Sequence, residues 1–265
     1  MDLRLRRPGG HGILPVEVEA DMEEITSTRN PRVLLWRSLK ERKARQESGL
    51  FLVEGRKSVE EALASGFAID TLLVTAGETP AADCPVCLLA EHVMAAVCDT
   101  KTPQGVAAVV RMRETQADGL RLVALDGVQD PGNVGTIIRT ADAAGFDGVL
   151  LSQTCADPFS PKVLRATMGS VFHLPVEIAE NLPERLRELQ RRGRQVLSSE
   201  LGGRPFGEWQ GHSGGFVLVI GNEGNGVSQE VRGLADEHLT LPMRGRAESL
   251  NAAVAAGIMM YKLTE

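Results

Sequence analysis

The second half of the chain, from residue 119 onward, alternates short apolar segments with segments of helical pattern. The apolar segments predict strands at residues 122–125, 149–151, 196–198, 216–220 and 238–241. The helical patterns lie at residues 135–144, 161–168, 183–192, 228–234 and 250–262. Continuous apolar strands that alternate with helices are typical of a parallel sheet covered by helices on both faces. We therefore expect an α/β domain whose ligands bind beyond the carboxyl ends of the strands.

The first half of the chain predicts a smaller α/β unit. A helix-start signature at residues 27–31 leads into an apolar stretch, and strands are expected at 50–53, 72–74, 86–89 and 106–110, with helices at 57–65 and 91–98. A polar segment at residues 112–120 separates the halves. We expect domains at residues 23–115 and 119–265, preceded by a disordered extension at residues 1–22.

Neither a membrane nor a metal is expected. No apolar run reaches the roughly 18 residues that span a bilayer, and the basic N-terminus has no apolar core of a secretion signal. Cys84 and Cys87 form a CxxC pair that could be combined with His92 and Cys98 into a zinc site, but the spacing fits no strong zinc pattern. Reduced cysteines in a cytoplasmic protein are the simpler interpretation.

The charge of the chain is unevenly distributed. The net charge of −6 argues against a nucleic-acid binder, yet residues 29–45 hold seven basic side chains and one acid, Glu41. A local basic cluster can bind a phosphate backbone whatever the net charge is. On charge alone, this cluster is equally well explained as a solvated helix face.

The first unusual loop, after the strand at 122–125, reads Asp-Pro-Gly-Asn-Val-Gly at residues 130–135. Its glycines suit a tight turn into a helix, with the amide of Asn133 at the tip. Asn133 could simply cap that helix. Arg139 follows about two turns into the helix, where it could face the loop and bind a phosphate.

Two further loops follow predicted strands. Residues 221–226 read Gly-Asn-Glu-Gly-Asn-Gly and lack the Lys-Ser/Thr of a phosphate-binding loop and the glycine pattern of a dinucleotide fold. Glu223 would repel phosphate, so the loop favours a cationic or hydroxyl-bearing ligand, unless it is only a turn of small residues. Residues 239–251 place Ser249 and Asn251 at the start of a helix rich in alanine and glycine, which could pack tightly or form a subunit interface.

Taken together, the three loops resemble the SpoU/TrmH family of RNA ribose methyltransferases, within the SPOUT superfamily. The elements Asn-x-Gly-x-x-x-Arg, Gly-Asn-Glu-Gly and Pro-Met-x-Gly…Ser-Leu-Asn occur in the order and spacing of the family, over residues 120–263. The first domain is similar, more weakly, to the ribosomal-protein-like substrate-binding domain that often precedes it. The resemblance implies a parallel sheet with a deep trefoil knot and a homodimer with the C-terminal helix near the interface.

The resemblance also implies the site. S-adenosylmethionine would lie bent in the knot, against the region 197–200, the loop at 221–224 and the third loop. The implied cofactor residues are Leu197, Ser198, Ser199, Gly221, Asn222, Gly224, Leu241, Met243 and Leu250. The implied catalytic residue is Arg139, surrounded by Asn133, Glu223, Ser249 and Asn251. Arginine stays protonated in proteins, so Arg139 is interpreted either as the base of the family proposals or as a clamp for phosphate and developing alkoxide.

The substrate is expected to be structured RNA, with 23S-type ribosomal RNA favoured over transfer RNA. We expect its phosphates to contact Arg29, Arg32, Lys40, Lys43 and Arg45. Two alternatives are a non-catalytic RNA-binding protein of the same fold and a dinucleotide-dependent α/β enzyme. The complete set of motif residues disfavours the first, and the missing glycine fingerprint disfavours the second.

Overall fold

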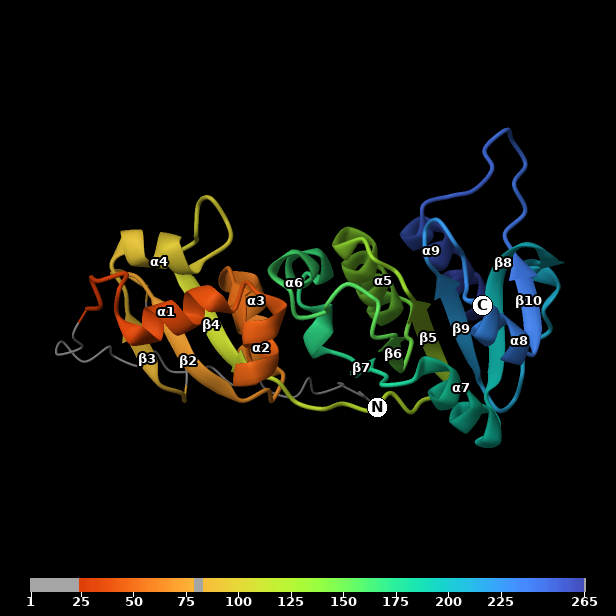
Figure 1. Ribbon diagram of the computed structural model, residues 1–265, viewed down its shortest axis with the longest axis horizontal. Coiled ribbons are helices and arrows are strands. Elements are labelled where there is room, and N and C mark those ends of the chain that lie inside the picture. Colours follow the sequence, from red (N-terminus) through yellow and green to blue (C-terminus); the bar gives the residue numbers. More distant parts are fainter. Residues whose placement is uncertain (1–23, 79–82, 265) are drawn as a thin grey trace, which may run out of the picture.

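The computed structural model describes residues 24–78 and 83–264. It contains two sheets, one of four strands and one of six, which lie side by side along the long axis of the molecule with helices between them (Figure 1). The extension expected at residues 1–22 lies outside the described residues. No helix in the described part of the chain is long and apolar enough to cross a membrane.

The smaller sheet has the strand order β1-β4-β2-β3. Strand β4 is antiparallel to β1 and β2, while β3 is parallel to β2. Helices α1 and α4 cover one face, and α3 covers the other. The elements of this part are α1 (Pro31–Ser38), α2 (Arg42–Ser48), β1 (Leu50–Glu54), α3 (Arg56–Ala64), β2 (Ile69–Val74), β3 (Val86–Leu88), α4 (Glu91–Val97) and β4 (Val106–Arg111).

The larger sheet has the order β10-β8-β9-β5-β6-β7, and every pair of neighbours is parallel. The α/β fold expected from the sequence is therefore confirmed, and the edge strand β7 was not predicted. The elements are β5 (Arg121–Asp126), α5 (Pro131–Ala143), β6 (Gly148–Leu151), α6 (Pro161–Thr167), β7 (Val176–Ile178), α7 (Leu182–Arg191), β8 (Gln195–Pro205), β9 (Phe216–Gly221), α8 (Gln229–Leu234), β10 (Glu237–Thr240) and α9 (Ala252–Thr264).

An apolar core continues from one sheet to the other. Phe51 of β1 packs against Phe159 and Phe172 of the larger unit, with ring centroids 4.8 and 6.3 Å apart, and Phe67 meets Phe172 edge-on at 5.2 Å. Aromatic pairs of this kind add about 0.5–1.5 kcal/mol each beyond the area they bury. The two sheets are therefore joined by a packed interface in addition to the linker.

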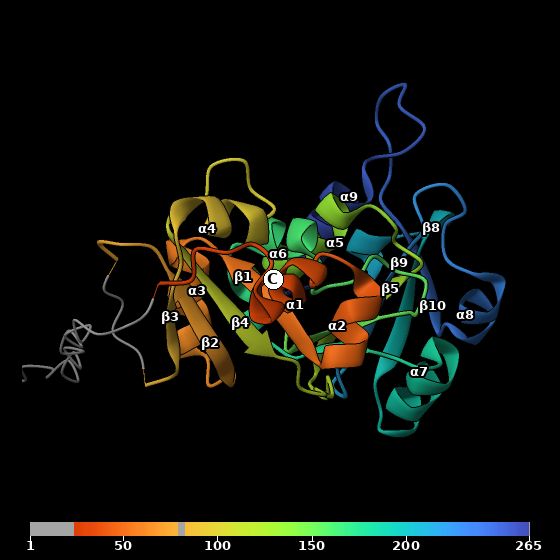
Figure 2. The ribbon, with the colours of Figure 1, turned by 60° about the vertical axis from the view of Figure 1, so that its left-hand side comes forward.

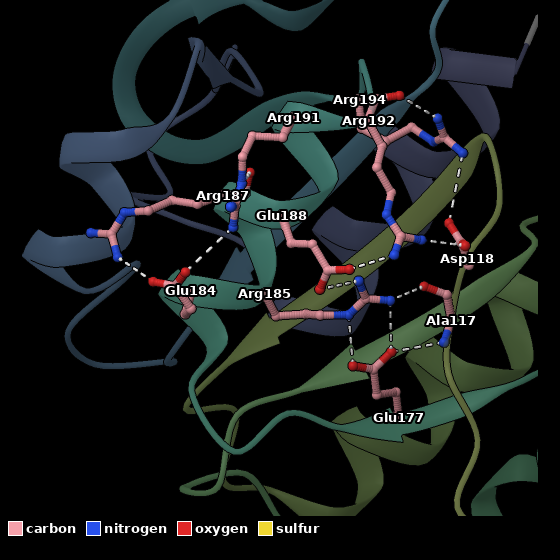
Figure 3. Close-up of polar contacts among 10 residues, drawn as sticks. All are labelled: Ala117, Asp118, Glu177, Glu184, Arg185, Arg187, Glu188, Arg191, Arg192 and Arg194. Atoms are coloured by element: carbon pink, nitrogen blue, oxygen red, sulfur yellow. Dashed lines mark hydrogen bonds and ion pairs between the residues drawn. The ribbon is translucent and has the colours of Figure 1, made fainter.

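The linker itself is fastened to α7 and the turn that follows it by three arginines (Figure 3). Arg185 is buried and donates to the carbonyl of Ala117 at 2.9 Å and to Glu177 at 2.8 Å. Arg192 pairs with Asp118 at 2.6 Å, and Arg194 donates to the carbonyl of Gly119 at 2.6 Å. Glu177 in turn accepts from the backbone N–H of Ala117 at 2.7 Å. The end of the polar segment 112–120 is thus held on the larger unit by fixed hydrogen bonds.

Helix α5 begins earlier than the sequence predicts. Asp130 is its N-cap, with Oδ1 accepting from the backbone N–H of Asn133 at 2.8 Å. Asn133 therefore lies inside the first turn, and the interpretation of Asn133 as the cap is wrong. Gly135 also has a packing role, because a Cβ there would lie 2.5 Å from the Cβ of Ala166 in α6. The amide of Asn133 is left available for other partners.

Candidate active site

A cavity of about 720 Å³ lies at the carboxyl edge of the larger sheet. Three segments form it: the middle of β8, the loop that follows β9, and the stretch between β10 and α9. That last stretch extends away from the sheet as the long loop at the top of Figure 2. The cavity is lined by Ser199, Glu200, Leu201, Ile220, Gly221, Asn222, Glu223, Gly224, Asn225, Gly226, Val227, Arg232, Thr240, Leu241, Met243, Glu248, Ser249, Leu250, Asn251, Ala252 and Ala255.

Side chains of the three motif loops form one hydrogen-bonded chain beside this cavity. Asn133 donates from Nδ2 to Oε1 of Glu223 at 2.9 Å. Asn251 donates from Nδ2 to Oδ1 of Asn133 at 2.9 Å. Asn251 also accepts, through Oδ1, from the backbone N–H groups of Ala253 and Val254, at 3.0 and 3.2 Å, and so caps α9. Residues about 90 and 118 positions apart in sequence are thereby fixed relative to one another.

Glu223 is held in its ionised form. Burial raises the pKa of its carboxyl group, but hydrogen bonds from Asn133 and from backbone N–H groups lower that pKa by more, so the net shift is downward. The backbone donors include Asp130 at 3.3 Å and Gln129 at 3.4 Å. A carboxylate that already accepts these bonds is a fixed negative charge near neutral pH, and it faces a cavity that suits a cationic ligand.

The loop after β9 has its shape fixed from within. A Cβ on Gly221 would lie 2.1 Å from the carbonyl carbon of Gly226, so only glycine fits at this position. Asn222 donates to the carbonyl of Gly127 at 2.8 Å and accepts from the backbone N–H groups of Gly224 and Asn225, both at 3.0 Å. Asn222 thus ties the loop after β9 to the loop after β5.

A second carboxylate lies at the far side of the cavity. Glu200 is only 10% exposed and accepts from Ser198 at 2.8 Å, while His238 and Arg232 lie 2.7 and 2.8 Å from its oxygens. Burial raises the pKa of Glu200, and hydrogen bonds from His238, Ser198 and Arg232 lower it further than burial raises it. Glu200 is the last residue of the segment 197–200, which the sequence analysis expects to contact the cofactor. Arg232 was not predicted, because nothing in the sequence pattern of α8 marks it.

Comparison with known proteins gives the same picture. The model of the SpoU rRNA methylase family matches residues 121–261, and that of the MRM3-like substrate-binding domain matches residues 30–108. The chain belongs to the SpoU rRNA methylase family. A relative from Bacillus subtilis (strain 168), the 23S rRNA (guanosine(2553)-2'-O)-methyltransferase RlmP, is 42% identical, over 91% of this chain and 99% of its own length.

Solved structures of SpoU-type proteins resemble the whole molecule. An AdoMet-bound rRNA methyltransferase from Sinorhizobium meliloti superposes with a TM-score of 0.83 at 37% identity, covering 91% of this chain and 97% of that one. The SpoU methyltransferase AviRb from Streptomyces viridochromogenes, in complex with the cofactor AdoMet, gives 0.82 at 28% identity, covering 89% and 97%. In both of these structures, a protein of this fold holds bound AdoMet.

The SpoU motif residues expected at the cofactor mostly line the cavity. Ser199, Gly221, Asn222, Gly224, Leu241, Met243 and Leu250 do so. Leu197 and Ser198 do not: both are fully buried in β8, where Leu197 belongs to the core and Ser198 donates to Glu200. Their side chains serve the sheet and Glu200, because this part of β8 lies between β9 and β10.

The SpoU motif residues expected at the reaction centre divide into two groups. Glu223, Ser249 and Asn251 line the cavity, and Asn133 joins two of them. Arg139 lies elsewhere: it is exposed on α5, does not line the cavity, and makes no ion pair with the described residues. The sequence spacing placed Arg139 on the correct helix but could not reveal which way that helix turns it.

Two of the five residues expected at RNA phosphates have structural partners instead. Arg45 is buried, donating from Nε to Asp157 at 3.0 Å and from Nη1 to the carbonyls of Leu39 and Lys40 at 2.7 and 2.8 Å. The expectation that Arg45 contacts RNA is therefore wrong. Lys40 is half-buried and donates to the carbonyl of Cys98 at 2.7 Å. Arg29, Arg32 and Lys43 are exposed, as a phosphate contact requires.

Proposed function

We propose that the chain transfers a methyl group from S-adenosylmethionine to a ribose 2′-hydroxyl of 23S-type ribosomal RNA. The observation that carries this proposal is the hydrogen-bonded chain Glu223–Asn133–Asn251, which assembles three separate family motifs at one cavity. The relatives support the RNA class, because they are rRNA methyltransferases and one of them is a 2′-O-methyltransferase. Transfer RNA is the alternative substrate that the experiment below distinguishes.

The cavity fits the cofactor in size and charge. Its volume of about 720 Å³ lies within the roughly 300–1,000 Å³ usual for small-molecule sites. Glu223 and Glu200 are ionised carboxylates on its wall, and S-adenosylmethionine carries positive charge on its sulfur and its amino group. The glycine loop at 221–226 and the apolar side chains of Leu241, Met243 and Leu250 would hold the cofactor. When bound, it supplies an already activated methyl group.

The protein's own part is to place the ribose hydroxyl and to stabilise the charge that develops on it. Transfer requires the attacking oxygen about 3 Å from the methyl carbon. Asn133 and Asn251 are amides fixed by their partners, and Ser249 offers a hydroxyl at the rim. A permanently protonated guanidinium suits Arg139 to the role of a clamp on a phosphate and the developing alkoxide rather than that of a base.

A homodimer is part of the same proposal. Helix α9 exposes Val254, Ile258 and Tyr261 by 51%, 42% and 51%, at a spacing that places them along one stripe. An apolar stripe of this kind suits a second copy of the chain. Gly257 of α9 lies against Thr140, the neighbour of Arg139 in α5. This contact one residue from Arg139 supports a position of its guanidinium near the surface at which a partner would dock.

The remaining expectations from the family resemblance belong to this proposal. We assign substrate binding to residues 23–115 and catalysis to residues 119–265, in the cytoplasm where ribosomal RNA is assembled. The deep trefoil knot is supported by the convergence of three separate C-terminal segments, 199–201, 220–227 and 240–252, on one cavity. The smaller sheet with its exposed basic residues supports the RNA-binding role of the first domain.

The decisive experiment removes the guanidinium and follows both halves of the reaction. Arg139→Ala is expected to lower methyl transfer to ribosomal RNA by at least about 100-fold, while calorimetry shows unchanged affinity for S-adenosylmethionine. Arg191→Ala, an exposed arginine of α7, is the matched control and keeps full activity. Near-wild-type transfer by Arg139→Ala overturns its assignment. Mapping of 2′-O-methyl positions in total RNA with and without the gene identifies the substrate, and a lost mark in transfer RNA alone overturns the ribosomal assignment.

A further inference from the structure

The junction between the two domains carries basic side chains that the cavity does not use. Helix α6 packs its side against β1, the edge strand of the smaller sheet, and the loops around this contact come from both domains. Five basic residues surround it, and four elements supply them: Arg42 (α2), Lys57 (α3), Lys101 (the loop before β4), Lys162 and Arg165 (both α6). We propose that the RNA backbone crosses from the substrate-binding domain to the cavity along this groove, called here the junction groove.

The groove contains a measurable hollow. A space of about 280 Å³ lies between the start of α3, the loop at residues 98–104 and α6. Lys57 and Arg165 line it from opposite domains, together with the polar side chains of Thr100, Thr102 and Gln104. Hydroxyl and amide groups beside cations are the side chains that most often contact phosphate and sugar oxygens. A nucleic-acid backbone is therefore the chemistry that this lining fits.

The groove leads to the proposed reaction centre through short steps. Arg165 lies 2.8 Å from Asp99 of the smaller unit, and Lys162 is three residues earlier on α6, on the same side of the helix. The ammonium of Lys162 lies 4.0 Å from Asp130. The backbone N–H of Asp130 in turn donates to Glu223, at the wall of the cavity. A strand that follows α6 toward its N-terminus thus arrives beside Asn133.

The second side of the groove is formed by the turn that joins α1 to α2. Arg42 donates to the carbonyl of Gln153 at 3.4 Å, in the loop between β6 and α6. Lys40, in the same turn, donates to the carbonyl of Cys98, next to the pair Asp99–Arg165. The basic segment at residues 29–45 therefore leads into the junction, and the exposed cations of α1 and α2 extend the groove outward.

The lysine charges of the groove are available to a phosphate. Three carboxylates lie along it, and each already has a partner: Glu54 accepts from the backbone N–H groups of Asp99 and Thr100, Asp99 pairs with Arg165, and Asp130 caps α5. Lys57 and Lys101 are exposed and form no ion pair with the described residues. Lys162 is 65% exposed at the limit of ion-pair distance, so little is lost when it binds a phosphate instead.

The groove is also preformed. The packing of Phe51 against Phe159 and Phe172, and the buried pair Arg45–Asp157, fix the substrate-binding domain against α6 before any RNA arrives. Binding then costs little ordering of the protein. This inference rests on the proposed function, because it takes the ribose at the cavity as the destination of the strand.

The test neutralises two exposed lysines of the groove, one from each domain. In the full chain, Lys101→Ala/Lys162→Ala is expected to weaken binding of 23S ribosomal RNA by about 10- to 100-fold, at about three- to tenfold per cation. The slope of log K against log salt should become shallower by about 1.4–1.8. The Michaelis constant for RNA rises, while affinity for S-adenosylmethionine stays unchanged. Lys101→Arg/Lys162→Arg should bind RNA as the wild type does, because it keeps both positive charges.

The control is a matched loss of two charges elsewhere. Arg187→Ala/Arg191→Ala removes two exposed arginines of α7 and should leave RNA affinity and salt slope as in the wild type. Unchanged affinity and slope in Lys101→Ala/Lys162→Ala overturn the groove, and so does an equal loss in the control. RNA binding is measured apart from methyl transfer. A wild type that binds RNA through these lysines but methylates none supports the groove and overturns the proposed function.

Discussion

Two arginine-rich segments, residues 29–45 and 185–194, look alike in the sequence and hold their charges differently. In the second segment, Arg185, Arg192 and Arg194 fasten the linker, and Arg187 and Arg191 lie 3.4–3.5 Å from carboxylates of Glu184 and Glu230 (Figure 3). In the first, Arg29, Arg32 and Arg37 are exposed with no carboxylate partner among the described residues, and Arg32 lies over the ring of Trp36.

The difference shows that a count of basic residues does not measure how many can bind a phosphate. In and just after α7, glutamates recur three and four residues from arginines, and further carboxylates lie on neighbouring segments, so these charges are satisfied within the protein. In α1, no acid occupies the corresponding positions, and only Glu41 follows. Even there, Arg45 is committed to Asp157. Availability is decided by the nearest carboxylate and by burial.

The largest effect expected from this comparison concerns Arg45. Arg45→Ala leaves the 9%-exposed carboxylate of Asp157 without its partner and should lower the free energy of unfolding by about 3–5 kcal/mol. Urea denaturation measures it. Lys43→Ala, two residues away, removes a side chain that is 85% exposed and should change stability by less than about 0.5 kcal/mol. Equal, small effects at both positions would show that the segment 29–45 is uniformly a surface feature.

A smaller effect is expected from removing two exposed charges at the start of α1 and just before it. Arg29→Ala/Arg32→Ala should weaken binding of ribosomal RNA about 5- to 30-fold, from roughly 0.5–1 kcal/mol per cation, and flatten the salt dependence. Filter binding over a range of salt concentrations measures both. The α7 pair Arg187→Ala/Arg191→Ala serves again as the control with unchanged binding. If the α7 pair weakens binding as much, the two arginine-rich segments do not differ in function.

The smallest expected effect is the pH-dependent contribution of His173 to stability. His173 lies 2.7 Å from Asp142 and 3.1 Å from Glu61, bridging α5 and α3, and its hydrogen bonds with Asp142 and then Glu61 raise its pKa. Because the pKa of His173 is higher in the folded state, the histidine contributes its full stabilisation below its unfolded pKa of about 6.5. That contribution is lost as the pH rises through the folded pKa.

Unfolding at pH 6 and pH 9 tests this bridge. Between pH 6 and pH 9, the free energy of unfolding of the wild type should fall by up to about 1 kcal/mol more than that of His173→Gln. The difference is small because the histidine is 40% exposed and solvent screens its ion pairs. Arg45 and His173 share no hydrogen-bond partner, so an Arg45→Ala background should show the same pH dependence as wild type. If the free energy of unfolding of the wild type does not change with pH, the bridge at His173 does not stabilise the contact between α5 and α3.

Much of the fold could be predicted because it follows from local pattern. Apolar strands that alternate with helices are sufficient to indicate a parallel sheet, and turn residues mark where its ligands bind. Strand β7 was missed because three residues carry too short a pattern. Helix α2, polar over Arg42–Ser48, has no apolar periodicity to reveal it and depends on the burial of Arg45.

The candidate site was predictable in its members but not in its connections. Glycines and polar residues after strands indicate which loops meet, whereas the bond from Asn251 to Asn133 joins residues 118 positions apart. The capping by Asp130 could have been found from its place before Pro131, a common first helical residue. The outward direction of Arg139 depends on which side of α5 packs against α6 and α9, which no local pattern fixes.

The shared aromatic core and the fastened linker have a consequence for how tightly a long substrate is held. A tethered domain on a flexible chain presents a second binding site at an effective concentration that falls with linker length. Here, Arg185, Arg192 and Arg194 remove most of that freedom. Once one part of an RNA is bound to the first domain, the position of its target ribose is set by the rigidity of the RNA alone. The nucleotide that is methylated would then be selected by its distance from the part of the RNA bound to the first domain, because the separation between that domain and the cavity is fixed.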